Sequence, residues 1–184
     1  MRHVAGLLLT PGAGGSRESA ALVAVERALD LPVRRIDFPN RLRGSRAPDR
    51  PPAAIAHLRE QADAFAESLG VEPDRVALGG RSFGGRMASM AVAQGQPAAG
   101  LVLLSYPLHP PGRPDRLRVE HLPNVAVPVL AVSGTADPFG TPDELATHLA
   151  AIAGRLTCTF VAGTHTPKDD DEVARTVAGW LTAL

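Results

Sequence analysis

Short apolar segments alternate with longer amphipathic segments along almost the whole chain. The short segments are bounded by Gly, Pro or Asp, and their nearly continuous hydrophobicity is typical of strands buried on both faces of a parallel sheet. They span residues 4–9, 33–38, 75–79, 100–104, 127–133 and 156–161. The longer segments have the length of helices and span residues 16–28, 52–69, 83–94, 141–153 and 169–184.

Two of the predicted helices carry clear start signals. Thr141 suits a capping residue, because Pro142 follows at the first helical position and Glu144 at the third. The acidic cluster 169–172 places carboxylates in a first helical turn, where the helix dipole favours them. Strands alternating with helices predict an α/β fold, a doubly wound, mainly parallel sheet of about six strands flanked by helices. Ligands on such sheets bind at the carboxyl ends of the strands.

Two proline-rich segments, 39–51 and 106–128, have neither a strand nor a helix pattern, and neither is long enough for a separate domain. The chain has 184 residues, of which 45% are hydrophobic and 21% charged, so we expect residues 1–184 to form a single α/β domain. The segment 105–127 is too short for an inserted helical cap. The sequence therefore predicts a shallow, open site.

Charge and cysteine content narrow the range of partners and compartments. The formal net charge is zero, which gives no reason to expect nucleic acid or an anionic membrane as a partner. No apolar run approaches the roughly 20 residues that cross a bilayer, and the start of the chain has no signal-peptide pattern. The lone Cys158 excludes an internal disulfide, so we expect a cytoplasmic protein. Frequent Ala, Gly, Pro and Arg indicate a GC-rich bacterial genome.

The strongest chemical signal is the pentapeptide 80–84, Gly-Arg-Ser-Phe-Gly, which lies between a predicted strand and a predicted helix. In that context Gly-x-Ser-x-Gly forms a sharp, strained turn that exposes the serine hydroxyl at the edge of the sheet. The helix N-terminus then points at the serine, and the backbone N–H of Phe83 becomes an oxyanion-hole donor. We therefore predict Ser82 as a nucleophile. A glycine-rich loop with an incidental serine is the alternative.

A second oxyanion donor is expected from the glycine-rich loop 10–16, which follows the first strand and precedes a helix. Its small residues let the backbone approach a substrate oxygen, and Ala13 or Gly14 is the expected donor. A phosphate-binding loop would require Gly-Lys-Ser/Thr, and the first lysine of the chain is Lys168. A simple tight turn is the remaining alternative.

A nucleophilic serine needs a general base, and the base needs a group that orients it. In sheets with this elbow the order along the chain is serine, acid, histidine. His165 lies just beyond the last predicted strand, and Asp137 follows the strand 127–133 in a turn closed by proline. We predict His165 as the base and Asp137 as the acceptor of its imidazole N–H. Asp143 is the second candidate for the acid, although its place in a first helical turn has a structural explanation.

Three further residues are weaker candidates for substrate binding. Arg81 flanks the nucleophile and could meet a substrate carboxylate or pair with a nearby acid. Tyr106 and His109 follow the fourth strand and could line the pocket. Because spacings such as Cys-x-x-Cys and His-Glu-x-x-His are absent from the sequence, we predict no metal and no cofactor.

With these motifs the chain resembles the dienelactone-hydrolase-like α/β-hydrolases. Within them it is similar to the small branch that includes the testis-expressed hydrolase-like protein and a subunit of the non-specific-lethal chromatin complex. The most specific stretches are 79–87, 105–112 and 134–139. The resemblance implies a minimal α/β-hydrolase fold without a cap, a catalytic Ser82, Asp137 and His165, and poorly defined substrates.

The chain also departs from that family. There is no room before residue 4 for the two antiparallel strands that begin larger members, and Pro11 stands where many have a histidine. Dienelactone hydrolases proper use a cysteine nucleophile, so Ser82 argues against that activity.

These observations predict a serine hydrolase of the carboxylesterase or thioesterase type, which cleaves a small-molecule acyl substrate through an acyl-enzyme on Ser82. Peptidase or acyltransferase activity would use the same three residues with another acceptor. The alternative from another class is a protein-interaction module that kept the fold and lost turnover, as the chromatin-complex relative suggests. A scaffold has no physical need for all three residues, which favours an enzyme.

Overall fold

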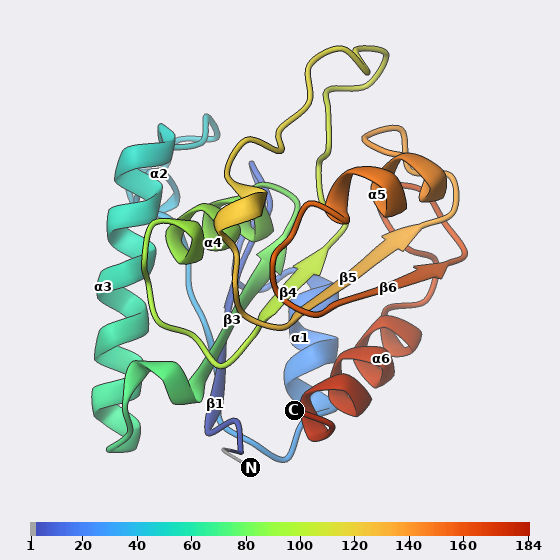
Figure 1. The fold of residues 1–184 in the computed structure, drawn as a ribbon. Helices are drawn as coiled ribbons and strands as arrows, with labels where there is room; N and C mark the ends of the chain where they lie inside the picture. Colours follow the sequence, from blue (N-terminus) through green and yellow to red (C-terminus); the bar gives the residue numbers. More distant parts are fainter. Residues whose placement is uncertain (1–2) are drawn as a thin grey trace.

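The apolar segments form a sheet of six parallel strands in the order β2-β1-β3-β4-β5-β6 (Figure 1). The computed structural model describes residues 3–184. The strand order reverses between β1 and β3, and open α/β sheets bind ligands beside such a reversal. The strands are β1 (Gly6–Thr10), β2 (Val33–Arg35), β3 (Val76–Arg81), β4 (Leu101–Leu104), β5 (Val129–Gly134) and β6 (Leu156–Val161).

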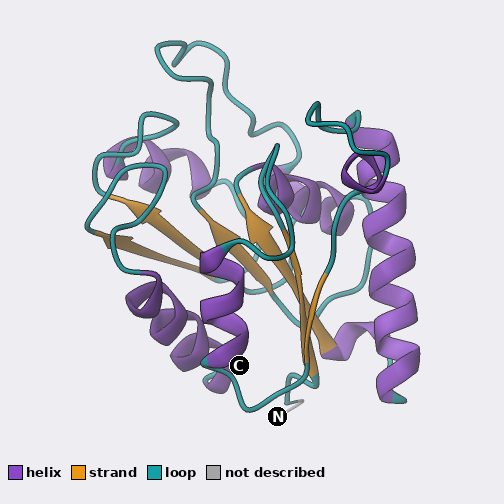
Figure 2. Cartoon of the chain, turned by 180° about the vertical axis from the view of Figure 1, so that it is seen from behind, coloured by secondary structure: helices purple, strands orange, loops and turns teal. Residues whose placement is uncertain are grey.

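Helices cover both faces of this sheet, as the two opposite views show (Figures 1 and 2). One face packs against α1 (Ala20–Arg27) and α6 (Asp170–Thr182). The other packs against α3 (Pro51–Leu69), α4 (Phe83–Ala93) and α5 (Pro142–Leu149). The predicted fold class is therefore confirmed: a doubly wound parallel sheet with no separate cap domain.

The core explains why the central strands are apolar throughout. Successive side chains of a strand point to opposite faces, so a strand covered on both faces buries every residue. In β1, Leu8 packs with α3 and α4, whereas Leu7 and Leu9 pack with α1 and α6. All three leucines are fully buried.

The predicted strand and helix positions hold, with shifted ends. The strand predicted over 33–38 ends at Arg35. The last hydrogen bond to β1 is that of the Ile36 N–H to the Leu9 carbonyl oxygen at 3.1 Å, after which the chain turns away from β1. The helix predicted from residue 16 begins at Ala20, because a turn from Ser16 to Ser19 precedes it.

The prediction that the segment 39–51 lacks regular structure was wrong, because α2 (Pro39–Leu42) lies within it. Asp49 holds this short helix in place. Its carboxylate accepts a hydrogen bond from the Asn40 N–H at 2.7 Å and forms an ion pair with Arg43. Short 3-10 turns also occur at η1 (Pro73–Arg75) and at η2 (Leu122–Asn124), the latter inside the proline-rich segment 106–128.

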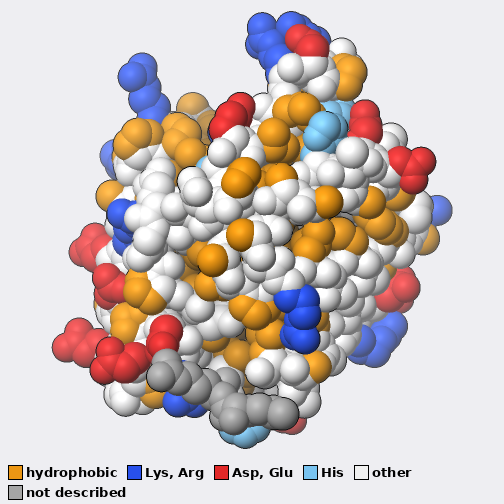
Figure 3. Space-filling model, viewed as in Figure 1, with side chains coloured by type: hydrophobic (Ala, Val, Ile, Leu, Met, Phe, Trp, Pro, Cys, Tyr) orange, Lys and Arg blue, Asp and Glu red, His pale blue; other side chains and the backbone are white. Residues whose placement is uncertain are grey.

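The loop between β4 and η2 projects from the carboxyl-end edge of the sheet (Figure 1). Side chains of both charge signs are distributed over the face that Figure 3 shows, with basic side chains at the top of the molecule. Within residues 3–184, no helix is long and apolar enough to cross a membrane.

Candidate active site

Ser82 lies in the sharp turn between β3 and α4, as the pentapeptide predicts. Its backbone has φ of 50° and ψ of −115°, a conformation that L residues rarely adopt. The Ser82 N–H donates to the carbonyl oxygen of Leu104 at 2.8 Å, which fixes the turn against the end of β4. A strained residue that the surrounding structure holds in place is typical of functional sites.

The flanking glycines are required by the close approach of β1. A Cβ on Gly80 would lie 2.6 Å from the carbonyl oxygen of Thr10, and one on Gly84 would lie 2.5 Å from that of Pro11. Both contacts are shorter than real Cβ atoms tolerate. The turn therefore brings the oxyanion loop beside Ser82 only because residues 80 and 84 lack side chains.

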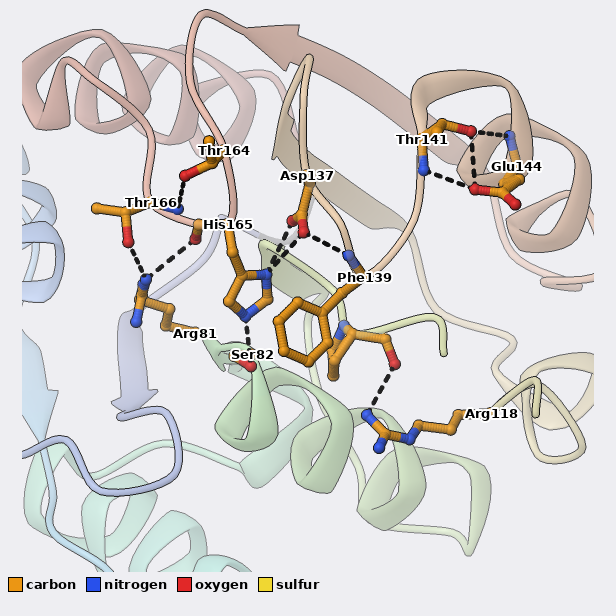
Figure 4. Close-up of polar contacts among 11 residues, drawn as sticks. Arg81, Ser82, Arg118, Asp137, Phe139, Thr141, Glu144, Thr164, His165 and Thr166 are labelled. Carbon is orange, nitrogen blue, oxygen red and sulfur yellow. Dashed lines mark hydrogen bonds and ion pairs between the residues drawn. The ribbon is translucent and has the colours of Figure 1, made fainter. Parts of the chain in front are cut away.

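Ser82, His165 and Asp137 form one continuous chain of hydrogen bonds (Figure 4). The distance from Ser82 Oγ to His165 Nε2 is 2.8 Å, and His165 Nδ1 lies 3.0 and 2.9 Å from the two carboxylate oxygens of Asp137. A carboxylate only accepts hydrogen bonds, so Nδ1–H donates to Asp137 and Nε2 accepts the hydroxyl proton of Ser82. The imidazole contacts Asp137 and not Asp143.

The carboxylate of Asp137 is held rigidly behind the imidazole. Its side chain is fully buried, and its Oδ1 accepts a further hydrogen bond from the Phe139 N–H at 2.9 Å. The ring of Phe139 stacks on the imidazole of His165, with centroids 4.1 Å apart. Sequence reasoning missed this contact, although the aromatic residue two positions after the acid was visible.

Arg81 holds the loop that carries His165. Its Nη2 donates to the carbonyl oxygen of His165 at 3.0 Å and to Thr166 Oγ1 at 2.8 Å (Figure 4). The loop also packs closely on β5, because a Cβ on Gly134 would lie 2.6 Å from the carbonyl oxygen of Gly163. Arg81 thus lines the site, but these bonds commit part of its guanidinium to the histidine loop.

The two predicted oxyanion donors lie on either side of Ser82. Phe83 is the first residue of α4, so its N–H has no acceptor within the helix. In the loop after β1, the Gly15 N–H bonds to the Gly12 carbonyl oxygen and closes a tight turn whose central residues are Ala13 and Gly14. Ala13 lines the same cavity as Phe83, whereas Gly14 does not. The geometry favours Ala13 over Gly14.

An open cavity of about 360 Å³ lies over Ser82 and His165. It joins the elbow, the oxyanion loop, the acid turn and the two proline-rich segments. Pro48 comes from the arginine-rich segment 39–51, and Pro107 and Arg118 come from the projecting loop. The remaining lining residues are Gly12, Ala13, Arg81, Phe83, Arg86 and Phe139.

A family model described as an alpha/beta hydrolase domain matches residues 3–179. The chain belongs to this family. The match covers nearly the whole sequence and agrees with the sheet order, the elbow at Ser82 and the absence of a cap domain.

Solved structures of other alpha/beta hydrolase proteins share the fold. A protein described as a hydrolase of the alpha/beta superfamily from Xanthomonas campestris pv. campestris is 22% identical, with a TM-score of 0.73 over 98% of this chain and 99% of that one. Est1E from Butyrivibrio proteoclasticus, with ferulic acid bound, is 16% identical, with a TM-score of 0.76 over 100% and 90%. Dienelactone hydrolase from Anabaena variabilis is 23% identical, with a TM-score of 0.71 over 98% and 87%.

Two predicted pocket residues of this alpha/beta hydrolase domain lie outside the cavity lining. Tyr106 is fully buried, and its hydroxyl donates to the Arg118 carbonyl oxygen at 2.6 Å. His109 is 5% exposed, and its Nε2 lies 3.5 Å from a carboxylate oxygen of Glu144. The prediction that these side chains contact a ligand therefore needs correction, because both point into the protein and anchor the projecting loop.

A second serine–histidine pair lies further along α4. Ser89 Oγ is 2.7 Å from His121 Nε2, and the same hydroxyl donates to the carbonyl oxygen of Arg86 at 2.8 Å. Ser89 is fully buried and has no access to the cavity. Burial, reinforced by the positive charge of Arg86, lowers the pKa of His121 to about 4.

Proposed function

We propose that this alpha/beta hydrolase is a serine hydrolase that cleaves carboxylic esters or thioesters through an acyl-enzyme on Ser82. The observation that carries the proposal is the continuous hydrogen-bond chain from Ser82 Oγ through His165 to Asp137, beside a cavity of about 360 Å³. Est1E, which is similar in fold, has ferulic acid bound, and dienelactone hydrolase is a second neighbour. These neighbours agree with a carboxylic substrate.

In the first half of the reaction, His165 Nε2 accepts the hydroxyl proton while Ser82 Oγ attacks the acyl carbon. The carbonyl oxygen becomes an oxyanion, and the N–H groups of Phe83 and Ala13 donate to it. Such donors stabilise the transition state because they are already oriented before charge develops. His165 then gives its proton to the leaving oxygen or sulfur, and the bond from that atom to the acyl carbon breaks.

In the second half, water takes the place of the leaving group. His165 accepts a proton from the water, whose oxygen attacks the acyl carbon of the ester on Ser82. The Ser82 oxygen leaves with the proton from the imidazolium, which restores the free enzyme and releases the acid. Asp137 stays ionised and stabilises the imidazolium in both halves.

Burst kinetics with 4-nitrophenyl acetate and a matched acetyl thioester test this function. We expect a burst of one product equivalent per active site when deacylation is the slower step, and steady turnover after it. Ser82→Ala should lose at least about 10⁴-fold in kcat/KM. Ser89→Ala is the matched control, because it removes the other histidine-bonded serine of the same helix.

An absence of turnover with every ester and thioester, or equal turnover by Ser82→Ala, would overturn the proposal. The first result would favour the interaction module, since the fold would then persist without chemistry. The closer relationship to the testis-expressed branch and a cytoplasmic location stay predictions from the sequence.

A further inference from the structure

The cavity over Ser82 contains positive charge that ester cleavage does not require. Three arginines line it, Arg81, Arg86 and Arg118, and the lining residues described include no Asp or Glu. Within residues 3–184, none of the three forms an ion pair. Other arginines of the chain do find acids, as Arg35 does with Glu26 at 2.8 Å.

Arg81 has a structural role in the histidine loop, but Arg86 and Arg118 keep donor capacity to spare. The Nε of Arg86 is buried and has no hydrogen-bond partner among the described residues. Arg118 donates from Nη1 to the carbonyl oxygen of Pro107 at 3.3 Å (Figure 4). A guanidinium has five N–H donors, so one bond leaves most of them for a ligand.

Arg86 and Arg118 also lie close enough to repel one another. Burial lowers the pKa of the Arg118 guanidinium, and the positive charge of Arg86 lowers it further. Partly buried like charges without an acid between them destabilise the free protein, and a bound anion relieves that repulsion.

The positive charge of Arg86 lies close to the nucleophile along the chain. Arg86 follows Ser82 by four residues, and its N–H bonds to the Ser82 carbonyl oxygen at 3.0 Å. Both residues also line the same cavity. An anionic group bound to Arg86 would therefore lie in the same cavity as an acyl carbon at Ser82.

We propose that Arg86 and Arg118 bind a carboxylate carried by the substrate, so that the preferred substrates are acidic esters or thioesters. This rests on the proposed function. Planar guanidinium groups match a carboxylate with paired hydrogen bonds, whereas an uncharged acyl chain would leave these donors without partners. Acyl chains with two to four carbons between the ester carbonyl and the carboxylate form the series that tests this.

Matched pairs of esters test this specificity. To test a carboxylate on the acyl group of the substrate, the 4-nitrophenyl monoesters of succinate, glutarate and adipate are each compared with a neutral partner. In the neutral partner the free carboxylic acid is converted to its methyl ester. To test a carboxylate on the leaving alcohol, 4-acetoxybenzoate is compared with its methyl ester. Non-enzymatic hydrolysis is subtracted, because a neighbouring carboxylate can itself attack an aryl ester.

In one of these two sets of esters, we expect kcat/KM for the acidic ester to exceed that of its neutral partner by at least about tenfold, mainly through a lower KM. Arg86→Gln and Arg118→Gln should remove most of that ratio while turnover of the neutral esters persists. Arg86→Lys should retain part of this ratio, because lysine keeps the positive charge but lacks the planar guanidinium that pairs with a carboxylate. Arg116→Gln is the charge-matched control, since this arginine of the same loop is exposed and does not line the cavity.

A preference for the acidic ester in either set supports the inference and shows whether the carboxylate belongs to the acyl group or to the leaving alcohol. Equal kcat/KM for acidic and neutral members in both sets would overturn it. So would an unchanged ratio in folded Arg86→Gln and Arg118→Gln. If the neutral esters still turn over on Ser82 in those cases, the acidic specificity fails and the proposed function stands.

Discussion

One serine–histidine pair lies at the start of α4 and a second lies within it, and their hydrogen bonds are almost equally long. Ser82 Oγ lies 2.8 Å from His165 Nε2, and Ser89 Oγ lies 2.7 Å from His121 Nε2. The first pair faces the cavity and has Asp137 behind the imidazole. In the second pair Ser89 is buried, and no carboxylate within residues 3–184 hydrogen-bonds to the His121 ring. A serine–histidine hydrogen bond alone therefore does not identify a catalytic site.

The two pairs also differ in which atom donates the hydrogen bond between serine and histidine. Ser89 has one hydroxyl proton and donates it to the carbonyl oxygen of Arg86, so His121 Nε2 is the donor to Ser89. A nitrogen that carries a proton cannot act as a base for that serine. In the other pair, Asp137 accepts a hydrogen bond from the Nδ1–H of His165, so Nε2 carries no proton and accepts from Ser82. The carboxylate sets the tautomer and thereby the chemistry.

The largest expected difference between the pairs comes from removing each histidine. His165→Gln should lose about 10⁶-fold in kcat for ester hydrolysis, because the nucleophile has no base. His121→Gln should stay within about threefold of the wild type, since its pair lies outside the cavity. Steady-state assays with 4-nitrophenyl acetate measure both. A large loss in folded His121→Gln would show that the second pair contributes to turnover.

Asp137→Asn should give the next largest effect. An amide can donate to Nδ1 and so favours the wrong tautomer of His165, which we expect to lower kcat about 10⁴-fold with the fold unchanged. Asp143→Asn is the matched control, and its activity should equal that of the wild type. The assignment of the acid is wrong if the two variants exchange these results.

The glycines of the elbow should show a smaller effect, on stability. Gly84→Ala places a Cβ 2.5 Å from the Pro11 carbonyl oxygen, and we expect a loss of about 1–3 kcal/mol in the free energy of unfolding. Gly179→Ala lies in the exposed interior of α6 with no atom within 4 Å of its new Cβ, so it should stabilise by up to about 1 kcal/mol. Urea denaturation compares them, and equal shifts would show that the elbow is not tightly packed.

The last expected effect is confined to low pH and is a pH dependence of stability from His121. Its pKa is lowered from 6.5 to about 4 in the folded protein, so the unfolded state binds more protons between these values. This contribution to the free energy of unfolding is present above pH 6.5 and is lost as the pH falls toward 4. Denaturation across pH 4–7 should show a gentler fall for His121→Gln than for the wild type. Identical curves would contradict the low pKa.

The sequence predicted much of the fold because the hydrophobic pattern reflects burial on both faces of the sheet. It also placed Ser82, Asp137 and His165 at one edge, since each follows a strand and parallel strands end together. Their catalytic roles stay predictions, although the structure brings them into hydrogen-bond contact.

The parts that sequence reasoning missed depend on contacts between distant segments. Tyr106 was expected in the pocket because it follows β4, but Ser105 has φ of 51°, so the alternation of the strand does not continue into Tyr106. Arg86 and Arg118 come together only because the projecting loop returns to α4. No local pattern encodes that approach.

The most direct test of the account is to locate a covalent adduct on the protein. Trypsin cleaves after Arg81 and Arg86, so Ser82 falls on the peptide 82–86 and Ser89 on the peptide that begins at Met87. After reaction with a fluorophosphonate and digestion, we expect the added mass on the peptide 82–86 alone. An unmodified folded protein, or added mass on the peptide with Ser89, would contradict the account.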